Sequence, residues 1–211
     1  MALAALLIYL VYFLLAFVVR GLLQWRGTGD SGFRMATERP GSPQWWARLA
    51  FVVALVSAAV APILALVGWL EPIAALDGSA VGFTGLVITL VGVAATFVAQ
   101  VAMGASWRVG VDPDEQTDLV RRWPFTVVRN PIFTAMLVAA VGLTLMVPNV
   151  VAIAALVLLA WALRYQVVVV EEPYLARTHG SSYLEYASQV GRFLPGIGKL
   201  RDDAVEVRRS T

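Results

Sequence analysis

The chain has 211 residues, of which 59% are hydrophobic and only 14% are charged. A typical soluble domain carries about 25% charged residues, so this composition excludes a single water-soluble core inside a polar shell. The formal net charge of +2 gives no reason to expect a nucleic-acid partner. Because there is no Cys and a single His, neither a disulfide framework nor a metal site built on these ligands is expected.

Five long apolar runs follow one another along the chain, and each approaches the roughly 20 residues that a membrane-spanning helix needs. They are residues 1–19, 49–70, 80–105, 131–147 and 150–170. The first run lacks the basic start and the cleavage site of a signal peptide, so we expect it to stay as a span. The short link Pro148-Asn149 predicts a helical hairpin of spans four and five. The sequence thus predicts an all-α integral membrane bundle of about five transmembrane helices, with short cytoplasmic C-terminal helices.

The basic residues favour one orientation of these spans. They follow the first, third and fifth spans: Arg20, Arg26, Arg34, Arg39 and Arg48; Arg108, Arg121, Arg122 and Arg129; Arg177, Arg192, Lys199, Arg201, Arg208 and Arg209. The links after the second and fourth spans carry only Glu71 and Asp77. By the positive-inside rule the N-terminus lies outside and the C-terminus in the cytoplasm. Abundant Arg beside a single Lys suggests a GC-rich bacterial genome, hence a bacterial inner membrane.

Three regions follow from this pattern. Residues 1–103 hold the first three spans and a polar cytoplasmic connector at 20–48, residues 104–200 hold spans four and five, and residues 201–211 form a charged tail. Gly78 and Gly82 form a G-x-x-x-G pair, a weak signal for close helix packing. Gln100, one turn from the cytoplasmic end of span three, either bonds locally or faces a site.

The segment after span five predicts two short helices. Pro173 disfavours helical geometry at Glu172, so span five should break there and a helix should run from Pro173 to Gly180. The sequence 182–185 has the form of a capping box and should begin a second helix, closed by Gly191. One face of this helix carries Tyr183, Tyr186 and Val190, so the helix should lie at the interface or cover a pocket.

The adjacent carboxylates Glu171 and Glu172 are the strongest candidates for chemistry. One interpretation pairs them with cytoplasmic arginines such as Arg164 or Arg129; the other gives them a cationic ligand group or sugar hydroxyls. The hairpin brings them near Arg129-Asn130, where a cation and a helix N-terminus favour an anion. A zwitterionic ligand with a carboxylate and an ammonium would suit this set.

A wider pattern includes these residues. It comprises Arg129-Asn130-Pro131-Ile132-Phe133, Gly142, Glu171-Glu172, Leu175, Gly180, Tyr183, Tyr186, Val190, Arg192 and Leu194-Pro195. From residue 103 to 195 the chain resembles the isoprenylcysteine carboxyl methyltransferase and phospholipid methyltransferase superfamily, which has an R-H-P-x-Y start, a glutamate pair, a G-x-x-Y-x-x-Y segment and a closing R-x-x-P. Two positions depart from that pattern: Asn130 replaces the family His, and Phe133 replaces the family Tyr.

The resemblance implies S-adenosylmethionine held between the last two spans and the following helix, and a lipophilic small-molecule or lipid acceptor entering from the bilayer. Arg129 and Glu172 would be catalytic. The residues that would bind the cofactor are Gly104, Arg129, Asn130, Glu171, Glu172, Tyr183, Tyr186 and Arg192. No nucleic-acid partner is expected, and a homo-oligomer is compatible with the sequence.

Two other functions stay open at this point. The first is an NADPH-dependent membrane reductase of steroid-reductase type, in which Arg121-Arg122 would meet a 2′-phosphate, although the chain has no nucleotide fingerprint. The second is a non-catalytic membrane protein that binds a ligand or a partner, for which Asn130 and Phe133 are the best support.

Overall fold

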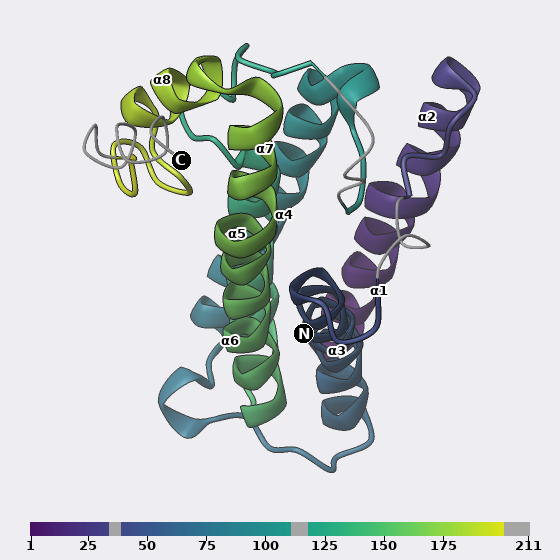
Figure 1. Cartoon of the computed structure of the whole chain (residues 1–211). Coiled ribbons are helices and arrows are strands. Elements are labelled where there is room, and N and C mark those ends of the chain that lie inside the picture. The colour runs from purple at the N-terminus through teal and green to yellow at the C-terminus, as the bar shows by residue number, and fades with distance from the viewer. Residues whose placement is uncertain (34–38, 111–117, 201–211) are drawn as a thin grey trace.

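The computed structural model describes residues 1–33, 39–110 and 118–200, and its regular elements in these ranges are all helices (Figure 1). Four of the described helices are long and apolar enough to cross a membrane: Ala2–Thr28, Pro43–Leu66, Ser79–Ser106 and Val150–His179. A fifth apolar helix, Pro131–Met146, is 16 residues long. The all-α architecture is therefore confirmed, whereas the count of five spans is not. The predicted tail 201–211, with Arg201, Arg208 and Arg209, lies outside the described residues, as does Arg34.

The first helix extends further than the apolar run suggests. α1 (Ala2–Phe13), the π-helical turn η1 (Leu14–Val19) and α2 (Arg20–Thr28) are continuous, so residues 20–28 are not part of a connector as predicted. The helix continues because its polar side chains find backbone carbonyls: Arg20 Nη2 donates to Gly104 O, and Gln24 Nε2 donates to Ala105 O, both at 2.7 Å. The helix ends at Gly29, whose φ of 76° only glycine adopts readily.

The second helix begins before its apolar run. α3 (Pro43–Leu66) begins with Pro43 in the first turn, and the Ser42 hydroxyl caps it by accepting from Trp45 N at 3.2 Å. The connector predicted at 20–48 is thereby shortened at both ends. A charged residue ends an apolar run, but it does not have to end a helix.

Glycines bring the third and fourth helices into close contact. α4 (Ser79–Met103) packs mainly against α5 (Pro131–Met146). A Cβ on Gly92 would lie 2.4 Å from Ala139 N, and one on Gly142 would lie 2.4 Å from Thr89 N. The G-x-x-x-G pair noted in the sequence does not make this contact, because Gly82 meets only Met1 and Gly78 faces open space.

The predicted hairpin joins α5 to α6 (Val150–Tyr165). Asn149 fixes the turn: its side chain accepts from Ala152 N at 2.9 Å, which caps α6, and donates to Ala61 O of α3 at 3.1 Å. α6 then packs chiefly against α3. The hairpin is thus tied to the second helix as well as closed on itself.

The break predicted at Glu172 is wrong. α6, the π-helical turn η5 (Gln166–Glu171) and α7 (Glu172–His179) are continuous, and Glu172 is helical with φ −61° and ψ −43°. The wider π turn accommodates Pro173, which has no N–H to donate. α7 does end at Gly180, as predicted. α8 (Ser181–Gln189) has no side-chain cap, because Ser182 already lies inside its first turn, so the expected capping box is absent.

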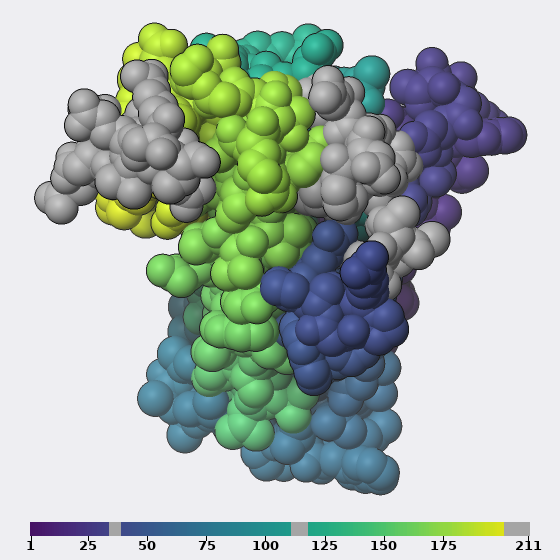
Figure 2. Space-filling model, viewed as in Figure 1, coloured from purple at the N-terminus to yellow at the C-terminus, as the bar shows by residue number. Residues whose placement is uncertain are grey.

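The elements that surround the candidate site gather at one end of the molecule. α2, the end of α4, α7 and α8 lie at the upper end in Figure 1, and the links after α3 and α5 lie at the lower end. In the space-filling view α7 and α8 form the upper front surface (Figure 2).

Candidate functional site

A cavity of about 990 Å³ runs from the side of the bundle to its upper end. This is the upper end of the size range of ligand pockets. Its walls come from the first helix (α1, η1 and α2), α3, the end of α4, the start of α5, the end of α6, η5, α7 and α8. The expected site between the last two spans is therefore only part of this space. α1 and α3, for which the sequence carries no family resemblance, supply much of its apolar wall.

Glu172 is enclosed by two arginines. Its side chain is buried, with 8% of the residue exposed, and Arg129 is 6% exposed. Arg129 Nη2 and Arg192 Nε both donate to Glu172 Oε1 at 2.7 Å, and Arg192 Nη2 donates to Oε2 at 2.9 Å. The hydrogen bonds with Glu172 raise the pKa of Arg192 above its usual value. The predicted pairing of this carboxylate with Arg129 is formed, and both of its oxygens are engaged.

Arg129 also ties the C-terminal segment to α5. Its guanidinium donates to three backbone carbonyls, those of Ala187, Val190 and Gly198, at 2.9, 2.6 and 3.1 Å. Next to it, Asn130 Nδ2 and the Asn130 backbone N both donate to Arg192 O at 3.1 Å. The start of α5 therefore holds the chain after α8 by a set of buried polar contacts. Asn130 is committed to this contact through its amide nitrogen.

Glu171 has a different environment from its neighbour. Its side chain lines the cavity, and its Oε1 accepts a long hydrogen bond of 3.3 Å from Gln166 Nε2. The charge of Arg108, which also lines the cavity, reaches this carboxylate. Adjacent helical residues point about 100° apart, which lets Glu172 face the two arginines while Glu171 faces the cavity.

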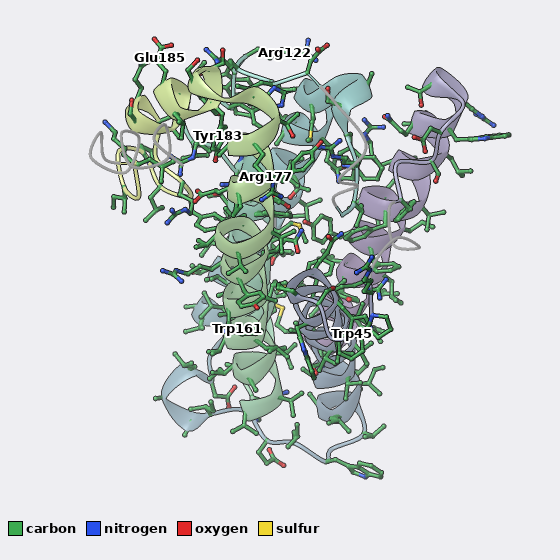
Figure 3. All side chains as sticks on the ribbon, in the orientation of Figure 1. Trp45, Arg122, Trp161, Arg177, Tyr183 and Glu185 are labelled. Atoms are coloured by element: carbon green, nitrogen blue, oxygen red, sulfur yellow. The ribbon has the colours of Figure 1, made fainter. Side chains whose placement is uncertain are left out.

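The two tyrosines of α8 close the upper wall. Tyr183 is 2% exposed, and its ring lies 6.4 Å from that of Tyr186 in an edge-on arrangement. Tyr186 OH donates to Phe125 O at 2.6 Å. Burial raises the pKa of Tyr186 to about 12 and raises the pKa of Tyr183 well above its usual range, so both phenols stay protonated. Figure 3 shows Tyr183 on the inner side of α8 and Glu185 on its outer side.

Two of the predicted site residues are not part of the cavity lining, Gly104 and Arg192. Gly104 has a φ of 61°, and a Cβ there would lie 2.9 Å from Arg122 Nη2. Its carbonyl accepts the hydrogen bond from Arg20, so Gly104 belongs to the junction of α2 and α4. Arg192 reaches Glu172 from outside the cavity.

Several lining residues had no signal in the sequence. Arg108 stacks over the Tyr174 ring at 5.3 Å. Trp107 also lines the cavity, and Arg20, which is outside the lining, lies over its ring at 4.6 Å. The sequence indicated these arginines only as charges beside a span. The contributions of α1 and α3 require knowledge of the tertiary packing, because neither helix carries a motif.

Comparisons with known proteins agree with this geometry. The phospholipid methyltransferase family model matches residues 80–182, from the start of α4 to the start of α8. The chain is 29% identical over 119 residues to a probable protein-S-isoprenylcysteine O-methyltransferase of Oryza sativa subsp. indica, and 28% identical over 115 residues to protein-S-isoprenylcysteine O-methyltransferase A of Arabidopsis thaliana. It is 27% identical over 108 residues to the nickel-cobalt-cadmium resistance protein NccN of Alcaligenes xylosoxydans xylosoxydans.

These matches cover 56%, 54% and 51% of this chain, and 62%, 58% and 50% of the three relatives. The chain thus spans about three fifths of the length of the plant relatives it matches. The matched region contains Gly104, Arg129, Asn130 and the glutamate pair, in the order that the superfamily pattern requires. These similarities support a place for the matched region in the superfamily of integral membrane methyltransferases that includes the isoprenylcysteine carboxyl and phospholipid methyltransferases.

Proposed function

We propose that this protein transfers a methyl group from S-adenosylmethionine to a lipophilic acceptor at the cytoplasmic face of the membrane. The observation that carries the proposal is a single cavity that joins a polar end, where Glu171 lies, to an apolar arm between α1 and α3. The N-terminus would lie outside and the C-terminus inside a bacterial inner membrane, as the basic residues indicate.

The polar end fits the charges of the cofactor. S-adenosylmethionine carries an ammonium, a carboxylate and a sulfonium, and the Glu171 carboxylate is placed to hold a cation. Arg129 Nε is buried without a partner in the described part of the chain and belongs to a residue that lines the cavity. The faces of Tyr183 and Tyr186 suit an adenine ring or a cationic sulfur. When bound, the cofactor supplies a methyl carbon that leaves sulfur, which keeps the electron pair, and bonds to an oxygen or nitrogen of the acceptor.

The residues of the chain would position the reactants and exclude water. If the acceptor is anionic, transfer from a sulfonium cancels both charges, so a dry site favours the transition state over separated ions. Glu172 is saturated by two arginines and Asn130 Nδ2 is engaged with Arg192 O. Of these groups, Glu171 is therefore the one that can accept a proton from a neutral acceptor.

The apolar arm indicates where the acceptor enters. Leu10 and Phe13 of α1 and Val52 and Val56 of α3 line the cavity and are exposed. A lipophilic acceptor would slide in between these two helices. The resemblance had implied only that the acceptor enters from the bilayer.

Calorimetric titration of the purified protein with S-adenosylmethionine and S-adenosylhomocysteine tests the proposal. Glu171→Gln keeps the size of the side chain and a partner for Gln166, but removes the negative charge. We expect it to weaken binding of both compounds by about 1–3 kcal/mol, the range for loss of a charged hydrogen-bond partner. Glu185→Gln, on the outer side of α8, is the matched control. Binding of NADPH, with none of either compound, would contradict the proposal.

A further inference from the structure

A second, smaller cavity lies beyond the apolar arm of the large one. It has a volume of about 50 Å³, and its walls come from α1, α3, α5 and α6, with alanines on all four helices. The three hydroxyls in its lining, those of Tyr9, Tyr12 and Thr144, all have partners on the protein. The small cavity is therefore an apolar space.

The small cavity continues the line of the large one toward the link between α5 and α6. On α5 the large cavity contacts positions from 131 to 136, and the small cavity contacts positions from 136 to 147. On α6 positions from 152 to 159 line the small cavity, whereas Ala162 and Leu163 line the large one. The two cavities thus occupy consecutive stretches of the same helices. An apolar tail that passed the end of the large cavity would enter the small one.

Three residues border both cavities: Tyr9 of α1, Leu55 of α3 and Met136 of α5. The Tyr9 hydroxyl donates to Leu55 O at 2.8 Å, and the Tyr9 ring lies 6.4 Å from that of Phe13 in a stacked arrangement. The hydrogen bond joins α1 to α3, the two helices between which the acceptor would enter. These three residues form the floor of the large cavity, and the Tyr9 ring is held in place there.

A closed floor limits the length of an apolar tail. Each methylene group that leaves water for an apolar space favours binding about fourfold, but only while further carbons find room. A tail longer than the arm has to displace the Tyr9 ring and break its bond to Leu55 O, or leave its last carbons outside the cavity. The Met136 side chain is flexible and gives way more readily than the hydrogen-bonded ring.

We propose that Tyr9, with Leu55 and Met136, ends the acceptor-binding arm and sets the longest apolar tail that the protein binds. The inference rests on the proposed function, because it defines the tail of the acceptor. The space behind the floor makes this limit changeable by one substitution. Without the Tyr9 ring the two cavities join, and a longer tail can extend between α5 and α6.

Photolabelling locates the end of the tail. Protein in lipid nanodiscs is irradiated with 1-alkanols, from decanol to eicosanol, that carry a diazirine on the last carbon. Mass spectrometry then quantifies the label that an excess of plain eicosanol competes away. In the wild-type protein we expect this label on residues 162–167 of the large cavity and not on residues 152–159 of the small one. Competed labelling of 152–159 in the wild-type protein overturns the inference.

Tyr9→Ala should open the floor. With the longest probes, competed labelling of residues 152–159 should rise about tenfold over the wild-type protein, the gain from burying about two further methylene groups. Met136→Ala opens the same floor from α5, should give a similar gain, and takes the place of Tyr9→Ala if that variant elutes as an aggregate. No gain in a folded variant of either kind contradicts the proposed floor.

Three further variants isolate the role of the ring. Tyr9→Phe keeps the ring without the bond to Leu55 O, and Phe51→Ala removes a ring that lines the large cavity alone, so neither should admit label to residues 152–159. Ala58 lines only the small cavity, and Ala58→Val should abolish the gain when it is combined with Tyr9→Ala. A gain in Phe51→Ala or Tyr9→Phe equal to that in Tyr9→Ala would overturn the assignment to the Tyr9 ring.

The outcome separates this inference from the proposed function. Binding of S-adenosylmethionine to the wild-type protein is measured without any alcohol present. If the cofactor binds and the opened floor admits no longer tail, the inference fails and the proposed function stands. If the limit moves with Tyr9 while the cofactor does not bind, the proposed function fails and the floor remains the determinant of which lipid tail the cavity holds.

Discussion

Two adjacent glutamates have separate tasks because they lie on different sides of one helix. Glu172 faces Arg129 and Arg192 and neutralises a buried cluster, whereas Glu171 faces the cavity. The break predicted at Glu172 would have left both carboxylates at the unfavourable negative end of a helix. The helix continues through His179, so neither carboxylate lies in its last turn and the conflict is removed.

Glu172→Gln tests the structural part of this division. The substitution leaves the Arg129 guanidinium buried without a charge partner, since only 3% of its side chain is exposed. We expect the free energy of unfolding to fall by about 3–5 kcal/mol, the cost of breaking a buried ion pair on one side. The measurement is a detergent-induced unfolding titration in mixed micelles. Glu171→Gln, at the adjacent position, should change the unfolding midpoint much less. Similar losses in both variants would contradict separate roles.

The residues of this cluster could be found from the sequence, but their contacts could not. The short link between spans four and five predicts that Arg129 lies near the glutamates. The hydrogen bond between Arg129 and Glu172 confirms this prediction. Which glutamate meets Arg129 depends on the phase of the helix through η5, and a π turn shifts that phase. The engagement of Asn130 with Arg192 O depends on the chain after α8 returning to α5, which no local pattern predicts.

Among the helices, α4 and α5 approach most closely because their contact is lined by small residues. Gly85 and Gly92 of α4 face Gly142 and Ala139 of α5, and Cβ atoms at these glycines would meet backbone atoms. The sequence motif at Gly78 and Gly82 pointed to the correct helix but to the wrong positions. A short spacing of glycines is common in apolar helices, and only the facing helix decides which of them are in contact.

Gly92→Ala tests this contact with the smallest possible change. The new Cβ would lie 2.4 Å from Ala139 N and 2.7 Å from Ala139 Cα, and backbone atoms cannot move aside as a flexible side chain does. We expect a loss of about 1–3 kcal/mol in the free energy of unfolding, the cost of overpacking a core. Gly27→Ala is the control, because Gly27 lies within α2 and a Cβ there has no neighbour within 4 Å. The control should be neutral or slightly stabilising. A tolerated Gly92→Ala would show that α4 and α5 are not held in this contact.

The extent of α2 shows why helix boundaries are hard to predict from a sequence. Arg20 and Gln24 end the first apolar run, and for that reason the sequence predicted that a polar connector begins at residue 20. Their partners are the carbonyls of Gly104 and Ala105, just after the end of α4 and about 80 residues later in the chain. Together with the bonds Tyr12–Thr96 and Gln100–Ala16, they form a row of polar contacts between the first helix and α4. Such long-range partners become visible only in the folded chain.

At the scale of the whole molecule, the cavity is lined partly by the region that matches the methyltransferase family and partly by helices outside that match. The region that matches the superfamily supplies the glutamates and Arg129, whereas Tyr9, Phe13 and Phe51 of the unmatched first two helices supply much of the apolar arm. This division explains why the proposed cofactor-binding region is recognisable in the sequence while the acceptor is not. The arm that would select the acceptor lies outside the residues that the family model matches.

Single cysteines can test the proposed orientation, since the chain has no Cys of its own and labelling has no background. Asp77, in the exposed link after α3, lies at the end of the molecule opposite α2 and α8. With the basic residues in the cytoplasm, Asp77→Cys should react with a membrane-impermeant maleimide on intact cells. Gly27→Cys and Ser182→Cys, both at exposed positions, should react only after the membrane is permeabilised. Expression and folding are controlled by labelling each variant in detergent. Reaction of Gly27→Cys on intact cells would reverse the orientation, and it would place Glu171 and the polar end of the cavity on the outer face, away from the cytoplasmic supply of S-adenosylmethionine.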